Sequence, residues 1–300
     1  VNHTSNNHPW FLDACEYIRK NGAPGGEYGD YYNFRITDNG AYHSVTGTKY
    51  SYEGQFWSGM PDLNLDSEKV RNEIRDVMNF WLTDCNVDGF RLDAVTSYYT
   101  GNIDANINFL SWINTEAKKI KPQAYIVGEA WVGSDYTIDR YYESGCDSFF
   151  LFTGSQASGT IAQAVKMNSG KMLGNLFERL QSTYGDAVLA PFLGNHDTMR
   201  PGSFMPGEER VKMAGGVMAM MNGGCFVYYG EEIGLSGANN DTYHDNRYDF
   251  DWNAQKKQAK ETGSMYNHYK TLLNIRRDYS EIIAKGNRIQ IVHDSGKGYE

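Results

Sequence analysis

Apolar residues recur at helical spacing in seven segments of the chain, and short alternating or apolar runs lie between them. The helical spacing predicts helices near residues 9–20, 67–85, 104–121, 157–168, 172–184, 208–222 and 264–278. The short runs predict strands at residues 89–93, 124–128, 148–152, 188–193 and 225–229. Asp66 precedes the second of these helices and is expected to cap it.

Strands and helices therefore alternate from residue 65 onward, which indicates a parallel sheet covered by helices. A (β/α)8 barrel explains this pattern best, because the carboxyl ends of its strands meet at one mouth. In an open doubly wound sheet, polar residues at the ends of distant strands would not reach one substrate. No glycine-rich phosphate loop follows any predicted strand, which disfavours nucleotide binding.

Residues 6–64 precede this alternation and do not share it. After the first helix they are rich in Gly, Tyr, Asn and Asp, and they predict an irregular excursion with two or three short strands. A loop of this length inside a compact domain usually serves a function. Residues 231–262 form a second polar loop, and residues 287–293 alternate like a strand of a further domain.

The segment Asp88–Val95 carries the first candidate chemistry. Alternation places Arg91 and Asp93 on one face of a strand, where the cation favours an ionised, oriented carboxylate. A buried structural ion pair would give the same pattern. Glu129 and Asp197 follow later strands in a comparable way, and this recurrence favours a catalytic set of carboxylates.

Composition narrows the classes of partner. The chain has 300 residues, a net charge of −9 and a pI of about 5.3, which disfavours nucleic acid and anionic membranes. No apolar run is long enough for a transmembrane helix. Aromatic residues make up 14%, with 22 Tyr, and they suit stacking on sugars as well as core packing. The four Cys lack metal or redox spacing, and we expect most of them to be free.

Five short motifs resemble those of the α-amylase family (glycoside hydrolase family 13), and the resemblance covers essentially the whole chain. One motif alone would be a weak signal, but all five occur in the family's order, at separations that each fit one barrel unit. They are Val1–Ser5, Met60–Asn64, Gly89–Ala94, Gly128–Trp131 and Phe192–Asp197. Residues 228–234 and 247–252 add support.

The resemblance implies roles for three carboxylates. Asp93 matches the nucleophile that forms the glycosyl intermediate, and Glu129 matches the general acid/base. Asp197 matches the carboxylate that grips sugar hydroxyls and favours the distorted ring. Arg91 matches the arginine that orients the nucleophile.

The resemblance also implies substrate and metal contacts. The residues assigned to substrate binding are His3, Arg91, Trp131, Asn195 and His196. A structural role is the alternative for the two histidines. Asn2 matches an asparagine that often ligates a structural Ca²⁺, and the loop 6–64 could supply further oxygens.

A retaining glycosidase requires two carboxyl groups about 5–5.5 Å apart, one ionised and one protonated. Arg91 favours the ionised form of Asp93, and the apolar sequence neighbours of Glu129 favour a protonated acid. We therefore expect double-displacement hydrolysis of α-1,4-glucosidic bonds in starch, glycogen or maltooligosaccharides. The alternatives are an α-1,6-glucosidase or neopullulanase, a 4-α-glucanotransferase, and a non-catalytic carbohydrate-binding protein.

Departures from the family pattern refine these expectations. Thr96 and Ser97 stand where many calcium-dependent members have Lys-His, which removes an acceptor-side lysine and weakens the case for Ca²⁺ at Asn2. Ala94 after the nucleophile favours α-1,4 linkages. Met60–Asn64 resembles the intermediary group between α-amylases and the oligo-1,6-glucosidases or neopullulanases.

The resemblance also predicts domain boundaries. Residues 1–5 would end the third barrel strand, 6–64 would form an inserted domain, and 65–281 would hold barrel strands four to eight with their helices. Residues 282–300 would begin a C-terminal antiparallel domain. The chain is thus expected to be an internal segment of a longer, monomeric enzyme. We expect that enzyme outside the cell or at its surface, with the cytoplasm as the alternative.

Overall fold

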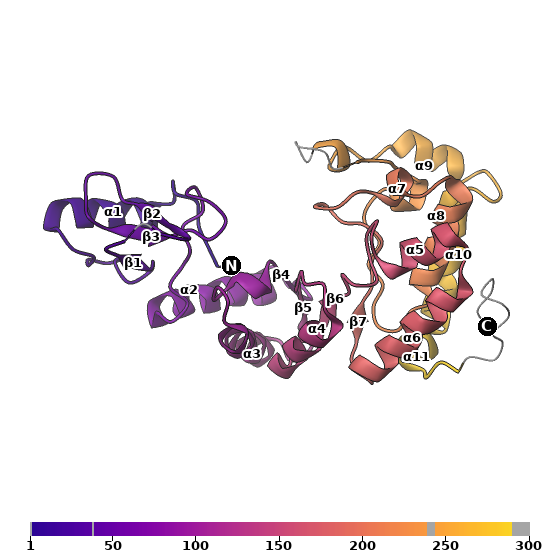
Figure 1. The fold of residues 1–300 in the computed structure, drawn as a ribbon, viewed down its shortest axis with the longest axis horizontal. Helices are drawn as coiled ribbons and strands as arrows, with labels where there is room; N and C mark the ends of the chain where they lie inside the picture. Colours follow the sequence, from indigo (N-terminus) through magenta and orange to yellow (C-terminus); the bar gives the residue numbers. More distant parts are fainter. Residues whose placement is uncertain (1, 38, 239–243, 290–300) are drawn as a thin grey trace. The chain divides into compact units, whose positions relative to one another are not determined.

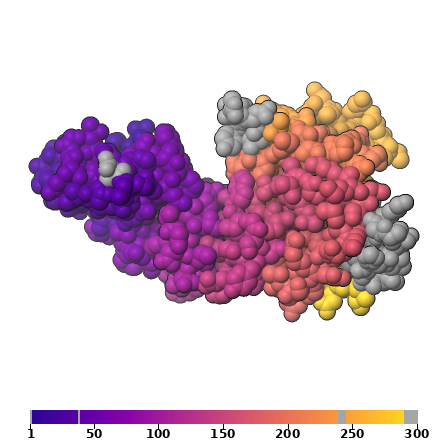
Figure 2. Space-filling model, in the orientation of Figure 1, coloured from indigo at the N-terminus to yellow at the C-terminus, as the bar shows by residue number. Residues whose placement is uncertain are grey.

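The computed structural model describes residues 2–37, 39–238 and 244–289, and the remaining residues are grey in Figure 1 and Figure 2. Val1 and residues 290–293 of the predicted last strand lie outside the described residues. The chain divides into two compact units. The first holds residues 1–129 and 143–146, and the second holds residues 130–142 and 147–300.

A small antiparallel sheet lies in the predicted excursion 6–64 of the first unit. Its strands are β1 (Phe34–Arg35), β2 (Tyr42–Ser44) and β3 (Ser51–Glu53), in the order β1-β3-β2. Helix α1 (Pro9–Asn21) precedes them, and its Phe11 ring meets the Tyr52 ring edge-on at 4.7 Å. The prediction of a helix followed by short strands is confirmed.

The rest of the first unit alternates helix and strand. Its elements are α2 (Glu68–Asn79), the π-helix η1 (Phe80–Asp84), β4 (Gly89–Leu92), α3 (Ile103–Ile120) and β5 (Tyr125–Gly128). Strands β4 and β5 are parallel, with Leu92 opposite Gly128. The predicted cap was wrong, because Ser67 rather than Asp66 occupies the N-cap position, without a side-chain cap bond.

The second unit is mainly helical, with two short parallel strands. The strands are β6 (Ser148–Phe150) and β7 (Leu189–Ala190), paired with Phe149 opposite Leu189. The helices are α4 (Asp135–Tyr141), α5 (Thr160–Met167), α6 (Gly170–Tyr184), α7 (Pro201–Phe204), α8 (Glu208–Ala219), α9 (Trp252–Gln258), α10 (Met265–Asp278) and α11 (Ser280–Lys285). Helix α5 packs against α6 and α8, and α8 packs against α10 (Figure 1).

Three local predictions need correction. The segment 225–229 contributes one parallel bridge, between Phe226 and Phe192, instead of a regular strand. Helix α9 lies inside the predicted polar loop 231–262. Helix α11 covers the first residues of the segment 282–300 that was assigned to a β domain. The division into two units does not test the predicted domain boundaries, which stay predictions.

The described residues also bear on two simpler expectations. In the described part of the chain, none of Cys15, Cys85, Cys146 and Cys225 forms a disulfide, as expected for most of them. No helix in the described part of the chain has the length and apolar character that crossing a bilayer would require.

Candidate active site

The first unit presents two candidate carboxylates at the ends of neighbouring strands. Gly89 begins β4 with φ +154, and a Cβ there would lie 1.9 Å from the Tyr125 carbonyl oxygen, so only glycine allows this close approach. With Leu92 opposite Gly128, Asp93 and Glu129 both follow their strands directly. The backbone N–H of Glu129 donates to the Leu92 carbonyl at 2.9 Å, which holds the two strand ends together.

A turn after Asp93 closes this arrangement. Ala94 adopts the left-handed conformation, with φ 43 and ψ 48, which costs energy for a residue with a Cβ. The turn directs the Ala94 backbone N–H to Glu129 Oε2 at 3.1 Å. Strained backbone of this kind concentrates at functional sites, where surrounding contacts hold it.

Arg91 bridges the two carboxylates. Its Nη1 lies 2.6 Å from Asp93 Oδ1, and its Nη2 lies 2.6 Å from Glu129 Oε1. Burial opposes the charge of Arg91, but the carboxylates of Glu129 and Asp93 outweigh burial and raise the pKa of the guanidinium. The predicted grouping of Arg91, Asp93 and Glu129 is therefore present within one unit.

The surroundings of Glu129 are more polar than its sequence neighbours indicated. The residue is only 5% exposed, in agreement with an enclosed acid. Both of its carboxylate oxygens, however, accept hydrogen bonds, one from Arg91 and one from Ala94. The prediction of an apolar setting was therefore incomplete, because it considered only residues adjacent in the chain.

His3 and Asn2 also lie in the first unit. Burial lowers the pKa of His3, while the Asp93 carboxylate acts in the opposite direction. The imidazole Nδ1 lies 3.0 Å from Asn2 Oδ1, and the Asn2 amide donates to the Ser97 carbonyl at 3.2 Å and to Asp62 Oδ1 at 3.4 Å. Burial raises the pKa of Asp62 to about 6.

The donors around Asn2 do not fit a calcium cage. Ca²⁺ takes about 6–8 oxygen ligands, whereas this cluster offers a single carboxylate, Asp62, with the Asn2 and Ser97 oxygens. The other carboxylate oxygen of Asp62, Oδ2, already accepts a hydrogen bond from the Gln55 backbone N–H at 2.8 Å. Across residues 2–37, 39–238 and 244–289, no three His, Cys, Asp or Glu side chains gather in a way that could hold a metal.

The second unit contains the motif that ends in Asp197. Asn195 shapes its turn, because Asn195 Oδ1 accepts the Asp197 backbone N–H and the Asn195 N–H donates to Thr198 Oγ1, both at 2.9 Å. His196 Nε2 lies 3.0 Å from Asp197 Oδ2. Asn195 therefore positions the turn, and substrate contact by Asn195 stays a prediction.

Sequence reasoning did not assign roles to two further residues that contact this turn. Arg247 Nη2 lies 2.5 Å from Asp197 Oδ1, and Arg247 Nε donates to the His196 carbonyl at 2.8 Å. The buried Asn246 side chain donates to the carbonyls of Asn195, His196 and Thr198. The motif at residues 247–252 was the signal that could have found Arg247, and Asn246 directly precedes it.

Trp131 follows Glu129 in the chain and lies in the second unit. It is 47% exposed, and its ring stacks on Phe152 at 4.8 Å with an interplanar angle of 16°. Both rings line a depression of about 200 Å³, together with Gln156 and Ser158. An exposed aromatic face backed by a second ring is suited to a sugar, and substrate binding by Trp131 stays a prediction.

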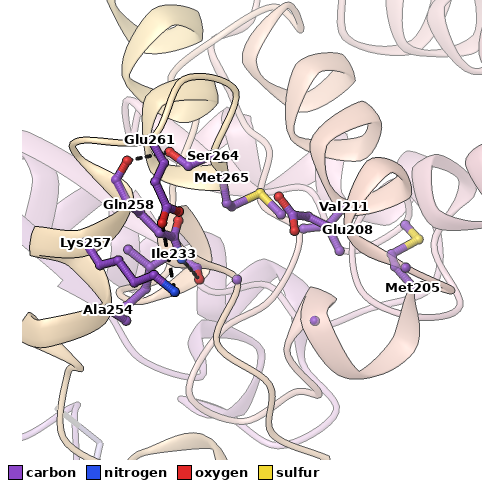
Figure 3. A pocket seen from close by; sticks show the side chains of 13 residues that line it. Met205, Glu208, Val211, Ile233, Ala254, Lys257, Gln258, Glu261, Ser264 and Met265 are labelled. Atoms are coloured by element: carbon purple, nitrogen blue, oxygen red, sulfur yellow. Dashed lines mark hydrogen bonds and ion pairs between the residues drawn. The ribbon is translucent and has the colours of Figure 1, made fainter.

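A larger cavity, of about 410 Å³, lies elsewhere in the second unit (Figure 3). Met205, Val211 and Met265 give it an apolar side, and Lys257 and Glu261 line it as well. None of the predicted site residues lines this cavity. The size of a cavity is therefore no guide to the position of the predicted catalytic carboxylates in this protein.

Comparison with known proteins decides the family. A family model described as "Alpha amylase, catalytic domain" matches residues 1–255. The chain belongs to the α-amylase family. An α-amylase-family relative named "Alpha-amylase 3", from Dictyoglomus thermophilum, is 33% identical over 308 residues, covering 92% of this chain. A relative named "Glucan 1,6-alpha-glucosidase", from Streptococcus pneumoniae, is 27% identical and covers 79% of this chain.

The α-amylase family fold is confirmed by structural comparison. The solved structure "Eubacterium rectale Amy13B" superposes with a TM-score of 0.90 over 99% of this chain, at 36% identity. The predicted (β/α)8 fold class is thus confirmed. The chain spans 58% of the first relative, 48% of the second and 64% of the solved structure.

Proposed function

We propose that the protein hydrolyses α-1,4-glucosidic bonds in starch, glycogen or maltooligosaccharides with retention of configuration. The observation that carries this proposal is the Arg91 bridge between Asp93 and Glu129 at the ends of two parallel strands. A retaining glycosidase needs two carboxyl groups held close together, and the ends of two adjacent strands can hold them in this way. A rigid pair of strands keeps them in place.

In the proposed mechanism, the Asp93 carboxylate attacks the anomeric carbon, and the bond to the leaving sugar breaks. Glu129 transfers its proton to the leaving oxygen, so that a covalent glycosyl-enzyme and a neutral sugar result. Glu129 then removes a proton from water, which attacks the same carbon and releases Asp93. By family resemblance, Asp197 grips the sugar hydroxyls, with Arg247 and His196 against its two oxygens.

The linkage is proposed on two observations. Ala94 follows the nucleophile, and a relative at 33% identity carries the name "Alpha-amylase 3". The relative named "Glucan 1,6-alpha-glucosidase" supports α-1,6 hydrolysis as the second candidate. Transfer to a sugar acceptor would use the same carboxylates and differ only in what resolves the intermediate. A non-catalytic role is disfavoured, because Asp93, Glu129 and Asp197 are all present.

The complete protein incubated with soluble starch tests the proposal through the release of reducing ends. Maltoheptaose should yield shorter maltooligosaccharides with a net gain of reducing ends, and isomaltooligosaccharides should react more slowly. Equal or faster cleavage of isomaltooligosaccharides would favour the α-1,6 candidate. Redistribution of chain lengths without new reducing ends would indicate transfer. No reaction with any of them would refute the proposal.

We further propose that the protein acts as a monomer outside the cell or at its surface, where polymeric α-glucans are accessible. Cell fractionation followed by immunoblotting tests the location, and sedimentation tests the oligomeric state. Recovery of the protein in the cytoplasmic fraction would contradict the proposed location.

A further inference from the structure

Arg200 is a charged residue that the proposed mechanism does not use, yet its side chain is fully buried, with 0% exposed. In the described part of the chain its N–H groups donate to backbone carbonyls rather than to a carboxylate, and the buried Glu231 carboxylate interacts with its charge only through space. Its guanidinium lies over the rings of Tyr228, Tyr229 and Tyr248, at 4.4, 4.6 and 5.5 Å from the ring centroids. Burying a cation is costly unless it is well bonded, so these contacts must hold the guanidinium in one place.

The guanidinium grips one backbone position in particular. Arg200 Nε and Nη2 both donate to the Asn246 carbonyl, at 3.2 and 2.8 Å, while Nη1 donates to the Tyr229 carbonyl. A planar fork with several N–H groups in fixed directions can make these bonds together, and a lysine ammonium cannot reproduce them. Arg200 therefore fixes the position of Asn246.

Asn246 in turn holds the turn that carries Asp197. Its side-chain amide donates to the carbonyls of Asn195 at 3.3 Å, His196 at 3.2 Å and Thr198 at 2.8 Å. The next residue, Arg247, contacts both the His196 carbonyl and the Asp197 carboxylate. Arg200 is thus connected to Asp197 through the contacts of residues 246 and 247. It is also connected through the chain itself, because Asp197 lies three residues before Arg200.

We propose that Arg200 is a positioning residue that sets the orientation of Asp197 through Asn246 and Arg247. This inference rests on the proposed function, because it assigns Arg200 to the same reaction. Arg200 does not touch the substrate. Its effect arises because a shift of about 1 Å in a substrate-holding group can cost on the order of 100-fold in rate. The substitution Arg200→Lys keeps the charge and removes the fork.

The test compares R200K with R276K in the complete protein. Arg276 is a matched control, because its guanidinium also donates to backbone carbonyls, those of Ala219, Met221 and Gly223, without contacting the Asp197 turn. R200K is expected to lower kcat on maltoheptaose by about 10- to 100-fold with little change in KM. R276K is expected to change kcat by less than about threefold. Thermal unfolding of both variants separates this effect from lost stability.

A double-mutant cycle distinguishes positioning from a general structural role. In a D197N background, R200K should lower kcat by less than about threefold, since the group that it positions is already impaired. A purely structural role would give the same fold loss in both backgrounds, and that result would overturn the inference. So would an R200K variant that loses no more activity than R276K.

A second variant keeps the test valid if R200K does not fold. N246S retains the carbonyl that Arg200 grips but removes the three side-chain bonds to the turn, and it should reproduce the loss in kcat. Unchanged kcat in N246S would overturn the inference. A wild-type protein without activity on α-glucans would refute the proposed function and this inference together, whereas active R200K and N246S variants would refute this inference alone.

Discussion

Arg91 Nη2 lies 2.6 Å from Glu129 Oε1, so the arginine expected to orient the nucleophile also holds the proposed general acid/base. The same guanidinium contacts Asp93 through Nη1. One side chain thereby links the two carboxyl groups, whose distinct protonation states the proposed mechanism requires. The relative position of the two carboxyl groups therefore depends on one guanidinium, and substitutions at these residues can test this dependence.

Glu129→Gln should abolish most turnover and leave starch binding intact. Glutamine is close in shape to glutamate but has no proton to give the leaving oxygen, and general acid–base catalysis contributes about 10²- to 10⁴-fold. The release of reducing ends and affinity electrophoresis in starch gels measure the two effects. Glu178→Gln, an exposed carboxylate on α6, is the control and should leave both unchanged. Full activity of E129Q would contradict the assigned role.

Arg91→Lys should lower kcat/KM even though the positive charge remains. A lysine ammonium cannot contact Asp93 and Glu129 with the geometry of a planar fork, so one carboxylate loses its position. We expect a loss of about 10²-fold or more, by analogy with other misplaced catalytic groups. Steady-state kinetics on maltoheptaose measures it. Wild-type kinetics in R91K, with an unchanged melting temperature, would show that the bridge is not needed.

The sequence predicted this part of the site well because the relevant residues lie at strand ends. Period-two alternation placed Arg91 and Asp93 on one face, and the next strand delivered Glu129 beside them. The turn at Ala94 was not predictable, since no local pattern signals a left-handed alanine. Arg247 was not assigned because it contacts Asp197 from 50 residues away.

The secondary-structure errors have equally physical causes. Helix α9 has the sequence Trp-Asn-Ala-Gln-Lys-Lys-Gln and buries none of its residues, so it carries no apolar stripe. Asp251 does accept the backbone N–H groups of Asn253 and Ala254, and this capping pattern was its only signal. Strand β7 is only two residues long, because only Leu189 and Ala190 have regular partners on β6. The length of a strand depends on its partner as much as on its own sequence.

Trp131→Ala should raise KM for maltoheptaose more than for maltotriose. The Trp131 ring is half-exposed and stacks on Phe152, so its free face can receive a sugar while its removal costs little stability. A lost stacking contact corresponds to about a twofold to tenfold change in KM. Tyr136→Ala removes another exposed aromatic, 72% exposed on α4, and serves as the control. Equal effects of both variants would contradict a sugar platform at Trp131.

Chelation should leave stability and activity unchanged. The Asn2 amide donates to both the Asp62 carboxylate and the Ser97 carbonyl, and the three residues together offer too few oxygens for Ca²⁺. EDTA-treated and Ca²⁺-supplemented samples of the complete protein should therefore melt within about 1 °C of each other, because a ligand that binds only the folded state would raise the melting temperature. A drop in melting temperature with EDTA that Ca²⁺ reverses would show that residues near Asn2 or elsewhere hold the metal.

Glu231→Gln should stabilise the protein increasingly as the pH rises from about 5 to about 8. Burial raises the pKa of Glu231 from 4.5 to about 8, and Tyr269 donates its hydroxyl to Oε1 at 2.7 Å. Between these pH values the folded state binds more protons than the unfolded state, so the free energy of unfolding of the wild type falls as the pH rises. Glutamine does not ionise, and the difference between variant and wild type should grow by at most about 1.4 kcal/mol per pH unit. Urea unfolding across this range measures the difference.

Glu261→Gln removes an exposed carboxylate of the same unit and should show no trend. A pH-independent difference for E231Q would contradict a buried, proton-binding Glu231.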